Sequence, residues 1–386
     1  MSQPDAALIE QVRTGLAGRG AGVDVDQVAS VLRAGGRVVG DETLRALVEA
    51  LERESFGAGP LESLLREPGV TDVLVNGAGQ VFVDRGAGLE AATVTFADDA
   101  AVRRLAQRLA AGGGRRLDEA SPFVDVRLRD GTRLHAALAP VARPGTLLSL
   151  RVPARRVFTL DELVARQLMS AGGARVLADI VASRTAFLVS GGTGSGKTTL
   201  LAALLSRVPA TERIVLVEDS AELRPAHPHV VALECRPPNV EGAGDIALRD
   251  LVRQALRMRP DRLVVGEVRG AEVVDLLAAL NTGHEGGCST VHANSAADVP
   301  ARLEALAMTA GVGREAAQAQ MLAGMRVVVH LRRAADGGRR LAEVGVLCAE
   351  QGGLGCLTAL AAEPGGRLVP GPAAGELERL LDDGQP

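Results

Sequence analysis

The sequence contains no tryptophan and no tyrosine, and only 6 of its 386 residues are phenylalanine. Proteins that bind single-stranded nucleic acid usually stack the bases on aromatic side chains. The formal net charge of −4 also differs from the basic charge that is typical of nucleic-acid-binding domains. The composition therefore argues against this class of protein, and we expect no direct contact with nucleic acid.

Cysteine is also scarce, with four residues and no C-x-x-C pair. In a chain of this length this pattern does not indicate a disulfide framework, and it favours a reducing compartment. The N-terminus lacks a basic segment followed by an apolar one, and no apolar run reaches about 18 residues, the length that predicts a membrane-spanning helix. We therefore expect a cytoplasmic protein that associates with the inner face of a membrane only through a partner.

Lysine is the rarest charged residue. Of the 43 Lys and Arg residues one is lysine, Lys197, and 42 are arginine. Lys197 lies in the segment GGTGSGKTT, residues 191–199, which we call the glycine-rich loop. This segment fits G-x-x-x-x-G-K-[ST], the pattern of loops that bind nucleotide phosphates. A short apolar run, 186–190, precedes the loop and a helix-forming run, 199–205, follows it, so the order is strand, loop and helix, as this motif requires.

The glycine-rich loop predicts a site for ATP and Mg²⁺. Glycines let the backbone curl so that successive N–H groups point at phosphate oxygens. We expect the Lys197 ammonium between the β- and γ-phosphates and the Thr198 hydroxyl as a ligand of Mg²⁺. The predicted nucleotide-binding residues of the loop are Gly192, Thr193, Gly194, Ser195, Gly196, Lys197, Thr198 and Thr199.

The rest of the chain predicts several segments around this loop. Alternating apolar and polar residues flank Asp130-Gly131, which is a strong hairpin signal, and Thr159 and Glu162 form the pattern of a helix capping box. Beyond it, strands and helices alternate as in a parallel-sheet α/β domain. The predicted segments are a helical N-terminal arm (1–55), an α+β domain (56–153), a linker (154–160), an α/β ATPase domain (161–348) and a flexible tail rich in glycine and proline (349–386).

Two groups of carboxylates follow predicted strands of the α/β domain. Glu267 ends the apolar run 262–266, and Glu218, Asp219 and Glu222 follow the run 213–217. In parallel α/β sheets, chemistry gathers at the carboxyl ends of the strands. Hydrolysis of a nucleotide needs a group that orients water and a bound Mg²⁺. We therefore expect Glu267 to polarise water and Glu218 to hold Mg²⁺ through a water molecule.

The segment 281–294 is dense in polar residues and includes His284, Cys288 and His292, each four residues apart. This spacing aligns zinc ligands only on a helix, and the glycines of the segment argue against a helix. The stronger interpretation is a loop whose histidines reach the γ-phosphate or an adjacent subunit.

Taken together, these motifs resemble those of the type II/IV secretion-system ATPases, and most closely those of the tight-adherence (Flp) pilus and conjugal-transfer branch. The resemblance covers about residues 56 to 345. In the first domain it runs through residues 59–61, 75–77, 116–122 and 131–133. In the second it runs through 191–199, 217–223, 236–239, 256–262, 266–270 and 282–294. Several motifs in the family's order are far more specific than the glycine-rich loop alone.

The resemblance implies a RecA-like P-loop NTPase motor domain behind a smaller α+β, PAS-like N-terminal domain and a helical N-terminal arm, with ATP bound between the two domains. It also implies a hexamer that drives an inner-membrane platform protein to assemble pilin-like subunits or export substrate. By the family's pattern, Lys197 is the Walker A lysine and Glu267 the Walker B glutamate. The other implied site residues are Glu218 and Glu222 of an acidic box, His284 and His292 of a histidine box, Arg133 and Arg151 as arginine fingers, and Arg257 and Arg269 as weaker candidates.

Two other functions remain open at this stage. One is a nucleotide-gated regulatory protein that binds ATP and a membrane or division partner with little turnover. The other is a DNA-translocating ATPase, which the acidity and the lack of aromatic residues disfavour. The combination of Lys197, Thr198 and Glu267 favours the motor ATPase over the regulator, because the regulator does not need a hydrolytic glutamate.

Overall fold

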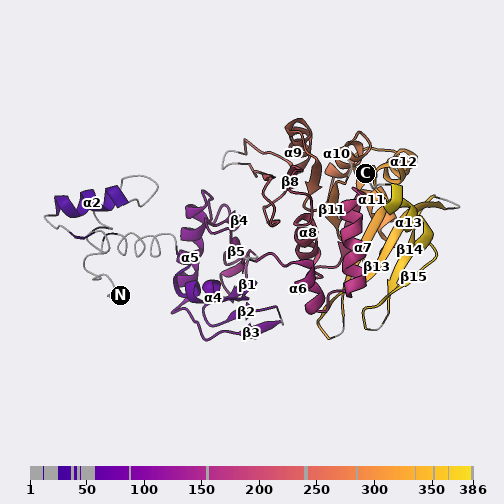
Figure 1. The fold of residues 1–386 in the computed structure, drawn as a ribbon. Coiled ribbons are helices and arrows are strands. Elements are labelled where there is room, and N and C mark those ends of the chain that lie inside the picture. Colours follow the sequence, from indigo (N-terminus) through magenta and orange to yellow (C-terminus); the bar gives the residue numbers. More distant parts are fainter. Residues whose placement is uncertain are drawn as a thin grey trace. The chain divides into compact units, whose positions relative to one another are not determined.

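The computed structural model describes residues 12, 25–35, 39–40, 44, 57–86, 88–153, 156–238, 242–283, 286–334, 336–350, 353–363 and 365–383. The chain divides into two compact units, Met1–Pro153 and Ala154–Pro386, and each is described by itself (Figure 1). Most of the predicted N-terminal arm lies outside the described residues; helix α2 (Val25–Ala34) is described there.

The first unit contains a six-stranded antiparallel sheet with the strand order β3-β2-β1-β6-β5-β4. Buried and more exposed residues alternate along its strands, as expected for a sheet with one covered face. Its core contains apolar residues of the strands and of helices α4 and α5. The elements are η1 (Gly59–Leu61), α4 (Glu62–Arg66), β1 (Asp72–Asn76), β2 (Val81–Asp84), β3 (Leu89–Ala91), α5 (Asp99–Gly112), β4 (Phe123–Arg127), β5 (Arg133–Ala137) and β6 (Leu147–Arg151).

The predicted hairpin at Asp130-Gly131 is present, because β4 and β5 are antiparallel partners and pair Arg127 with Arg133. Gly131 has φ +88°, a left-handed conformation that favours glycine. The α+β character of this unit therefore agrees with the sequence prediction, and its polar sheet face carries the arginines discussed below.

The second unit contains a nine-stranded sheet in the order β15-β14-β13-β12-β7-β11-β10-β8-β9. The six strands from β12 to β9 are parallel, and β13, β14 and β15 extend the sheet in antiparallel fashion. Their bounds are β7 (Phe187–Gly191), β8 (Ile214–Glu218), β9 (Val230–Glu234), β10 (Arg262–Val265), β11 (Cys288–Val291), β12 (Val327–Arg333), β13 (Arg339–Glu350), β14 (Gly353–Ala362) and β15 (Leu368–Pro370).

Helices cover both faces of this sheet (Figure 1). On one face the core includes α6 (Leu160–Ala165), α7 (Ala171–Ala182), α8 (Lys197–Leu205) and α13 (Ala374–Asp383). On the other it includes α9 (Leu248–Ala255), α10 (Glu272–Leu280), α11 (Val299–Thr309) and α12 (Arg314–Gly324), with the short helix η2 (Leu256–Met258) after α9.

Strand β7 shows how the sequence specifies this double-sided core. All five of its residues are buried, and its side chains alternate, with Phe187 and Val189 in one core and Leu188 in the other. A continuous apolar run of this kind is typical of a parallel strand with helices on both faces. This doubly covered, mostly parallel sheet agrees with the predicted α/β fold of the second domain.

The predicted capping box is present at the start of α6. The backbone N–H of Glu162 donates to Thr159 Oγ1 over 3.2 Å, and the backbone N–H of Thr159 donates to Glu162 Oε2 over 2.9 Å. Each bond satisfies a backbone donor that the first turn of a helix leaves without a partner. Among the described residues, none of the helices has both the length and the apolar character that crossing a lipid bilayer requires.

The C-terminal segment corrects the prediction of a flexible tail over 349–386. Strands β14 and β15 extend the main sheet, and α13 packs on it through Leu377, which is 3% exposed. Some of the glycines and prolines that suggested disorder, such as Gly353, Gly371 and Pro372, lie where elements begin and end, while Gly355 lies within β14. Between them, small and apolar residues fill a strand, so overall composition was a poor guide to the structure here.

Candidate functional site

The glycine-rich loop joins the end of β7 to the start of α8. Gly191, Gly194 and Gly196 have φ of +150°, +71° and +97°, which L side chains rarely adopt. A Cβ on Gly191 would lie only 2.4 Å from the carbonyl oxygen of Leu331. The loop therefore favours glycine at these three positions, and it leads into the N-terminus of α8, an arrangement that favours an anion.

Lys197 is the first residue of α8, and its side chain turns back into the loop. Its ammonium nitrogen Nζ donates to the carbonyl oxygens of Gly191 over 3.0 Å and Gly192 over 3.1 Å. The same nitrogen lies 3.4 Å from each ring nitrogen of His292. Lys197 is 7% exposed. A buried cation at a helix N-terminus is an arrangement that favours an anion such as phosphate.

Glu267 and His292 come from neighbouring strands. Strand β11 lies between β7 and β10 in the sheet; His292 directly follows β11, and Glu267 follows β10 after one residue. His292 Nε2 lies 2.8 Å from Glu267 Oε1, and Arg269 Nη2 lies 2.5 Å from Glu267 Oε2. The structure therefore brings Lys197, His292 and Glu267 into one chain of contacts at the carboxyl ends of adjacent strands.

The protonation of His292 follows from this position. Burial lowers the pKa of His292, and the nearby Lys197 charge lowers it further, against the opposing effect of Glu267. His292 is therefore neutral near pH 7. A neutral imidazole between an ammonium and a carboxylate can donate one hydrogen bond and accept another.

Glu218 ends strand β8 and is 4% exposed. Its Oε1 accepts the backbone N–H groups of Glu222 and Leu223, each over 3.0 Å, while its Oε2 is buried without a protein partner. Burial raises the pKa of Glu218 to about 7. A Cβ on Gly266 would lie 2.7 Å from Glu218 Cγ, so this carboxyl packs against the residue before Glu267.

The unpartnered oxygen of Glu218 gives a test of whether the site suits Mg²⁺. A buried carboxylate oxygen without a hydrogen-bond partner needs a proton or a cation. Carboxylate and hydroxyl oxygens are ligand types that Mg²⁺ takes beside its waters and a phosphate. Glu218 therefore fits the Mg²⁺ that the sequence predicted.

Glu218→Gln should remove a pH dependence of stability. Folding raises the pKa of this carboxyl from 4.5 to about 7. Its protonation therefore stabilises the fold fully at a pH below 4.5, the pKa in the unfolded state. This stabilisation is lost as the pH rises through about 7, the pKa in the folded state. Without Mg²⁺, we expect the wild type to lose about 2–3 kcal/mol of unfolding free energy from this group between pH 5 and pH 8. Urea unfolding at both pH values measures the loss.

Glu222→Gln, which removes a carboxylate from the same turn, is the matched control and should keep most of the wild-type pH dependence. A Glu218→Gln protein whose unfolding free energy changes with pH as much as that of the wild type would show that Glu218 is ionised throughout, contrary to this interpretation.

The arginines predicted as fingers lie in the first unit. Arg133 on β5 and Arg151 on β6 are direct cross-strand partners, and Arg127 on β4 is the partner of Arg133 on the other side. Like charges directly opposite each other destabilise a sheet. On its other side Arg151 is the cross-strand partner of Asp72 on β1, so the row of three arginines ends beside a carboxylate.

Other predicted positions fall outside this chain of contacts. His284 lies outside the described residues. The backbone N–H of Glu222 donates to Glu218, and Arg257 Nη1 in η2 donates to the carbonyl of Arg253 in the preceding helix α9. Cys288 is fully buried in β11. In the described part of the chain no cluster of three or more His, Cys, Asp or Glu residues is arranged to hold a metal ion.

Sequence reasoning missed one residue at the loop. Arg339, the first residue of β13, donates from Nε to the carbonyl oxygen of Gly194 over 3.0 Å. The two residues are 145 positions apart, and Arg339 belongs to none of the motifs. The sequence contains no signal that β13 lies beside the loop, so the motifs could not have identified Arg339.

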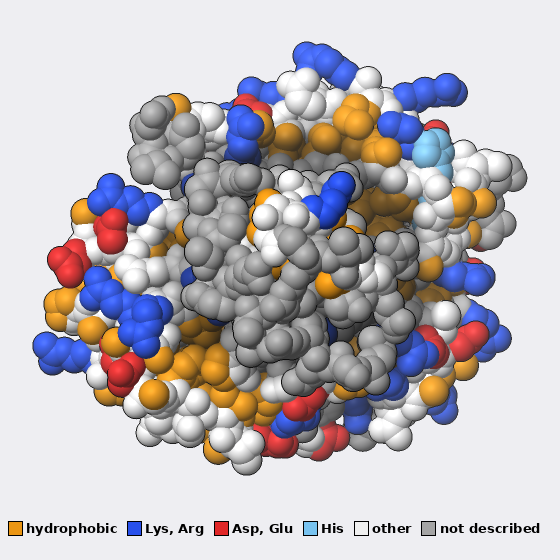
Figure 2. Space-filling view, turned by 90° about the vertical axis from the view of Figure 1, so that its left-hand side faces the viewer, with side chains coloured by type: hydrophobic (Ala, Val, Ile, Leu, Met, Phe, Trp, Pro, Cys, Tyr) orange, Lys and Arg blue, Asp and Glu red, His pale blue; other side chains and the backbone are white. Residues whose placement is uncertain are grey.

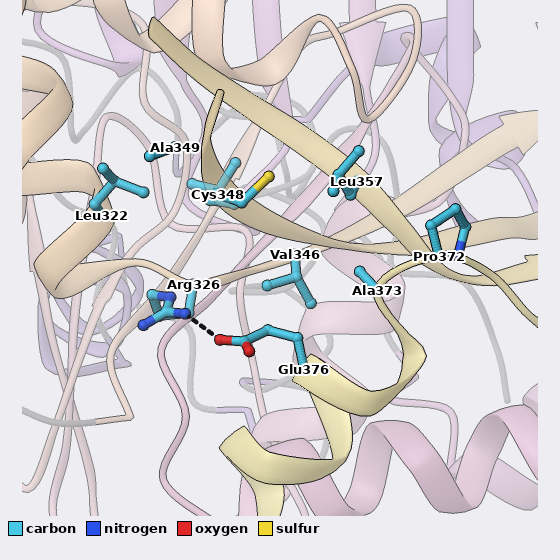
Figure 3. A pocket seen from close by; sticks show the side chains of 10 residues that line it. Leu322, Arg326, Val346, Cys348, Ala349, Leu357, Pro372, Ala373 and Glu376 are labelled. Carbon is cyan, nitrogen blue, oxygen red and sulfur yellow. Dashed lines mark hydrogen bonds and ion pairs between the residues drawn. The ribbon is translucent and has the colours of Figure 1, made fainter. Parts of the chain in front are cut away.

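A cavity of about 420 Å³ lies elsewhere in the second unit (Figure 3). Residues of α12, β13, β14 and α13 line it, and none of them belongs to the glycine-rich loop or is a predicted site residue. At its edge Arg326 Nη2 pairs with Glu376 Oε1 over 2.6 Å. This ion pair fastens α13 to the segment before β12, so the cavity belongs to the packing of the C-terminal helix.

Comparisons with known proteins show which family the chain resembles. The family described as type II/IV secretion system protein matches residues 54–358. A putative conjugal transfer protein of Mycobacterium tuberculosis strain H37Rv is 54% identical over 334 residues, which cover 85% of this chain and 95% of that protein. The conjugal transfer protein TrbB of Rhizobium radiobacter is 31% identical over 281 residues, covering 71% of this chain and 83% of that protein.

Among solved structures, the pilus retraction motor PilT with bound ADP matches with a TM-score of 0.52 at 20% identity, covering 83% of this chain and 84% of that one. At this identity the likeness bears on the fold alone.

Proposed function

This chain belongs to the type II/IV secretion system protein family, and we propose that it is an Mg²⁺-dependent ATPase that powers a secretion, conjugal-transfer or pilus-assembly machine. The single observation that best supports this function is the chain of contacts from Lys197 through His292 to Glu267. It joins a phosphate-binding cation to a carboxylate that can orient water, which are the two parts that hydrolysis of a terminal phosphate needs.

In this proposal the glycine-rich loop binds the triphosphate of ATP. Its N–H groups and the Lys197 ammonium stabilise charge on the phosphates as the terminal bond breaks. Thr198 and Glu218 would hold Mg²⁺, which would supply further positive charge at the phosphates. The ammonium now donates to two carbonyls of its own loop, and these bonds give way to bonds with phosphate oxygens.

Glu267 orients the attacking water and accepts its proton. Arg269 donates to its Oε2, while its Oε1 lies 2.8 Å from His292 Nε2 without a hydrogen bond. Arg269 therefore orients the carboxylate before substrate binds, and Oε1 is left for the water. His292 contacts both Lys197 and Glu267, and it therefore links occupancy of the phosphate site to the position of the carboxylate. This is the sensor role expected for the histidine segment.

Arg133→Ala should lower the turnover number more than it lowers nucleotide affinity. An arginine finger stabilises charge that develops in the transition state, so its loss affects kcat rather than ground-state binding. We expect kcat to fall at least about tenfold, with a change in nucleotide Kd of less than about threefold. Steady-state ATPase assays and nucleotide titration measure the two quantities.

Arg85→Ala is a suitable control, because Arg85 lies in the same unit and pairs with Glu67 and Glu90 at its surface. An unchanged kcat in Arg133→Ala would assign Arg133 to the solvated face of the sheet.

We further propose that the protein works as a homo-hexamer and transmits motion to an inner-membrane platform protein. ATP hydrolysis should be measured alone, with the purified platform protein, and with DNA. Stimulation by the platform protein supports the motor. Negligible turnover in all three conditions supports the nucleotide-gated regulator, and stimulation by DNA alone supports a translocase. Light scattering with and without ATP measures the oligomeric state.

The distribution of charge does not favour the translocase. On the face drawn in Figure 2, Lys and Arg side chains are interspersed with Asp and Glu side chains. Binding along a phosphate backbone favours a continuous basic surface instead. The net charge of −4 also argues against a DNA-translocating ATPase.

A further inference from the structure

The hairpin of β12 and β13 lies directly beside the glycine-rich loop. Strand β12 is parallel to β7, and its Leu331 is the register partner of Gly191, the first residue of the loop. The hairpin continues beyond that point, where Arg333 pairs with Arg339 across its two strands. The end of the hairpin, with Arg333 and Arg339, therefore lies beside the residues that are predicted to bind phosphate.

Arg339 is the hairpin residue that contacts the loop. Its Nε donates to the carbonyl oxygen of Gly194 over 3.0 Å. A Cβ on Gly196 would lie 3.3 Å from Arg339 Cδ, so the side chain lies against the loop at Gly194 and Gly196. Within the described residues no carboxylate pairs with Arg339, whereas the next arginine, Arg340, pairs with Asp336.

The bond to Gly194 fixes the orientation of a peptide group. The carbonyl of Gly194 and the N–H of Ser195 belong to the same planar peptide and point in opposite directions. Arg339 holds the carbonyl outward, and the N–H of Ser195 points into the loop, where it makes only a long bond of 3.3 Å to the carbonyl of Gly192. That N–H is thus oriented for an anion inside the loop.

We propose that Arg339 is a positioning residue of the nucleotide site. It holds the Gly194–Ser195 peptide with its N–H toward the phosphates, and its unneutralised charge adds to the attraction for them. The inference rests on the proposed function, because it requires nucleotide at the glycine-rich loop. Arg339 acts on the loop and not on the Glu267 side of the site, so ADP and ATP gain equally from it.

The test is the affinity for nucleotide diphosphate and triphosphate in Arg339→Gln. We expect the Kd for both a fluorescent ADP and a non-hydrolysable ATP analogue to rise about tenfold, the usual loss for a hydrogen bond to a charged group. At saturating ATP, kcat should stay within about twofold of the wild type, so that the effect appears in KM. Arg339→Lys, which keeps the charge and a donor, should recover most of the affinity.

Arg333→Gln is the matched control. Arg333 is the cross-strand partner of Arg339 on the same hairpin, and its Nε donates to the carbonyl of Gly337 in the hairpin's own turn. The Arg333→Gln substitution removes the same charge from a side chain that does not contact the glycine-rich loop. It should leave the ADP Kd within about twofold of the wild type. Thermal unfolding of each variant checks that the fold is intact.

The outcomes separate the two proposals. If the wild type binds ADP and Arg339→Gln binds it as tightly as Arg333→Gln does, the role of Arg339 is wrong while the proposed function stands. The same holds if kcat falls and the Kd does not change. If the wild type binds neither nucleotide, the proposed function itself fails.

Discussion

Lys197→Ala is expected to abolish ATP turnover and to weaken nucleotide binding by at least about 100-fold. Each hydrogen bond to a charged group contributes about 1.5–3 kcal/mol, and the ammonium is expected to make more than one with the phosphates. Its present partners, the carbonyls of Gly191 and Gly192, cannot replace it, because they would repel the phosphate oxygens. Isothermal titration with ADP and a coupled ATPase assay measure the two effects.

Lys197→Arg is the informative control for this prediction. It keeps the charge but replaces a compact ammonium with a planar guanidinium, which does not fit between the loop carbonyls and His292 in the same way. We expect it to remain strongly impaired. Full activity in Lys197→Ala, with the fold verified by thermal unfolding, would refute the assignment of the glycine-rich loop as the phosphate site.

Glu267→Gln is expected to bind ATP almost normally and to hydrolyse it at least about 100-fold more slowly. Removal of a positioned general base typically costs two to four orders of magnitude in rate. Glutamine has nearly the same shape and can still contact His292 and Arg269, so the change removes the basic oxygen with little effect on packing. Single-turnover hydrolysis and nucleotide titration separate chemistry from binding.

Arg269→Gln provides the matched control for Glu267, because it removes the partner of the carboxylate and keeps the carboxylate itself. It should reduce kcat far less than Glu267→Gln does. Near-normal turnover in Glu267→Gln would transfer the hydrolytic role to another acid of the site, with Glu218 and Glu222 as the candidates.

The sequence predicted the centre of the candidate site well because its parts are local. A glycine-rich loop after an apolar strand, and a carboxylate or histidine just after another, are patterns within a few residues. Since parallel strands end at the same edge of a sheet, these patterns predicted Lys197 and Glu267 at the phosphates, and His292 at the γ-phosphate or at an adjacent subunit. The structure brings these three side chains into contact.

What sequence reasoning missed depends on contacts between distant segments. Arg339 meets the loop only because β12 and β13 lie beside β7 in the sheet. The raised pKa of Glu218 depends on burial against Gly266 from another strand. The C-terminal segment is ordered because β13 offers it an edge on which to pair, and composition alone carries no information about such an edge.

The central claim is that a triphosphate binds in the glycine-rich loop with its terminal phosphate between Lys197 and Glu267. A crystal structure of the protein with Mg²⁺ and a non-hydrolysable ATP analogue tests this most directly. The account predicts the analogue in the loop, the Lys197 ammonium on its phosphates, and Glu267 facing the terminal phosphate across a water molecule. An empty loop at saturating analogue, or Glu267 turned away from the terminal phosphate, would contradict it.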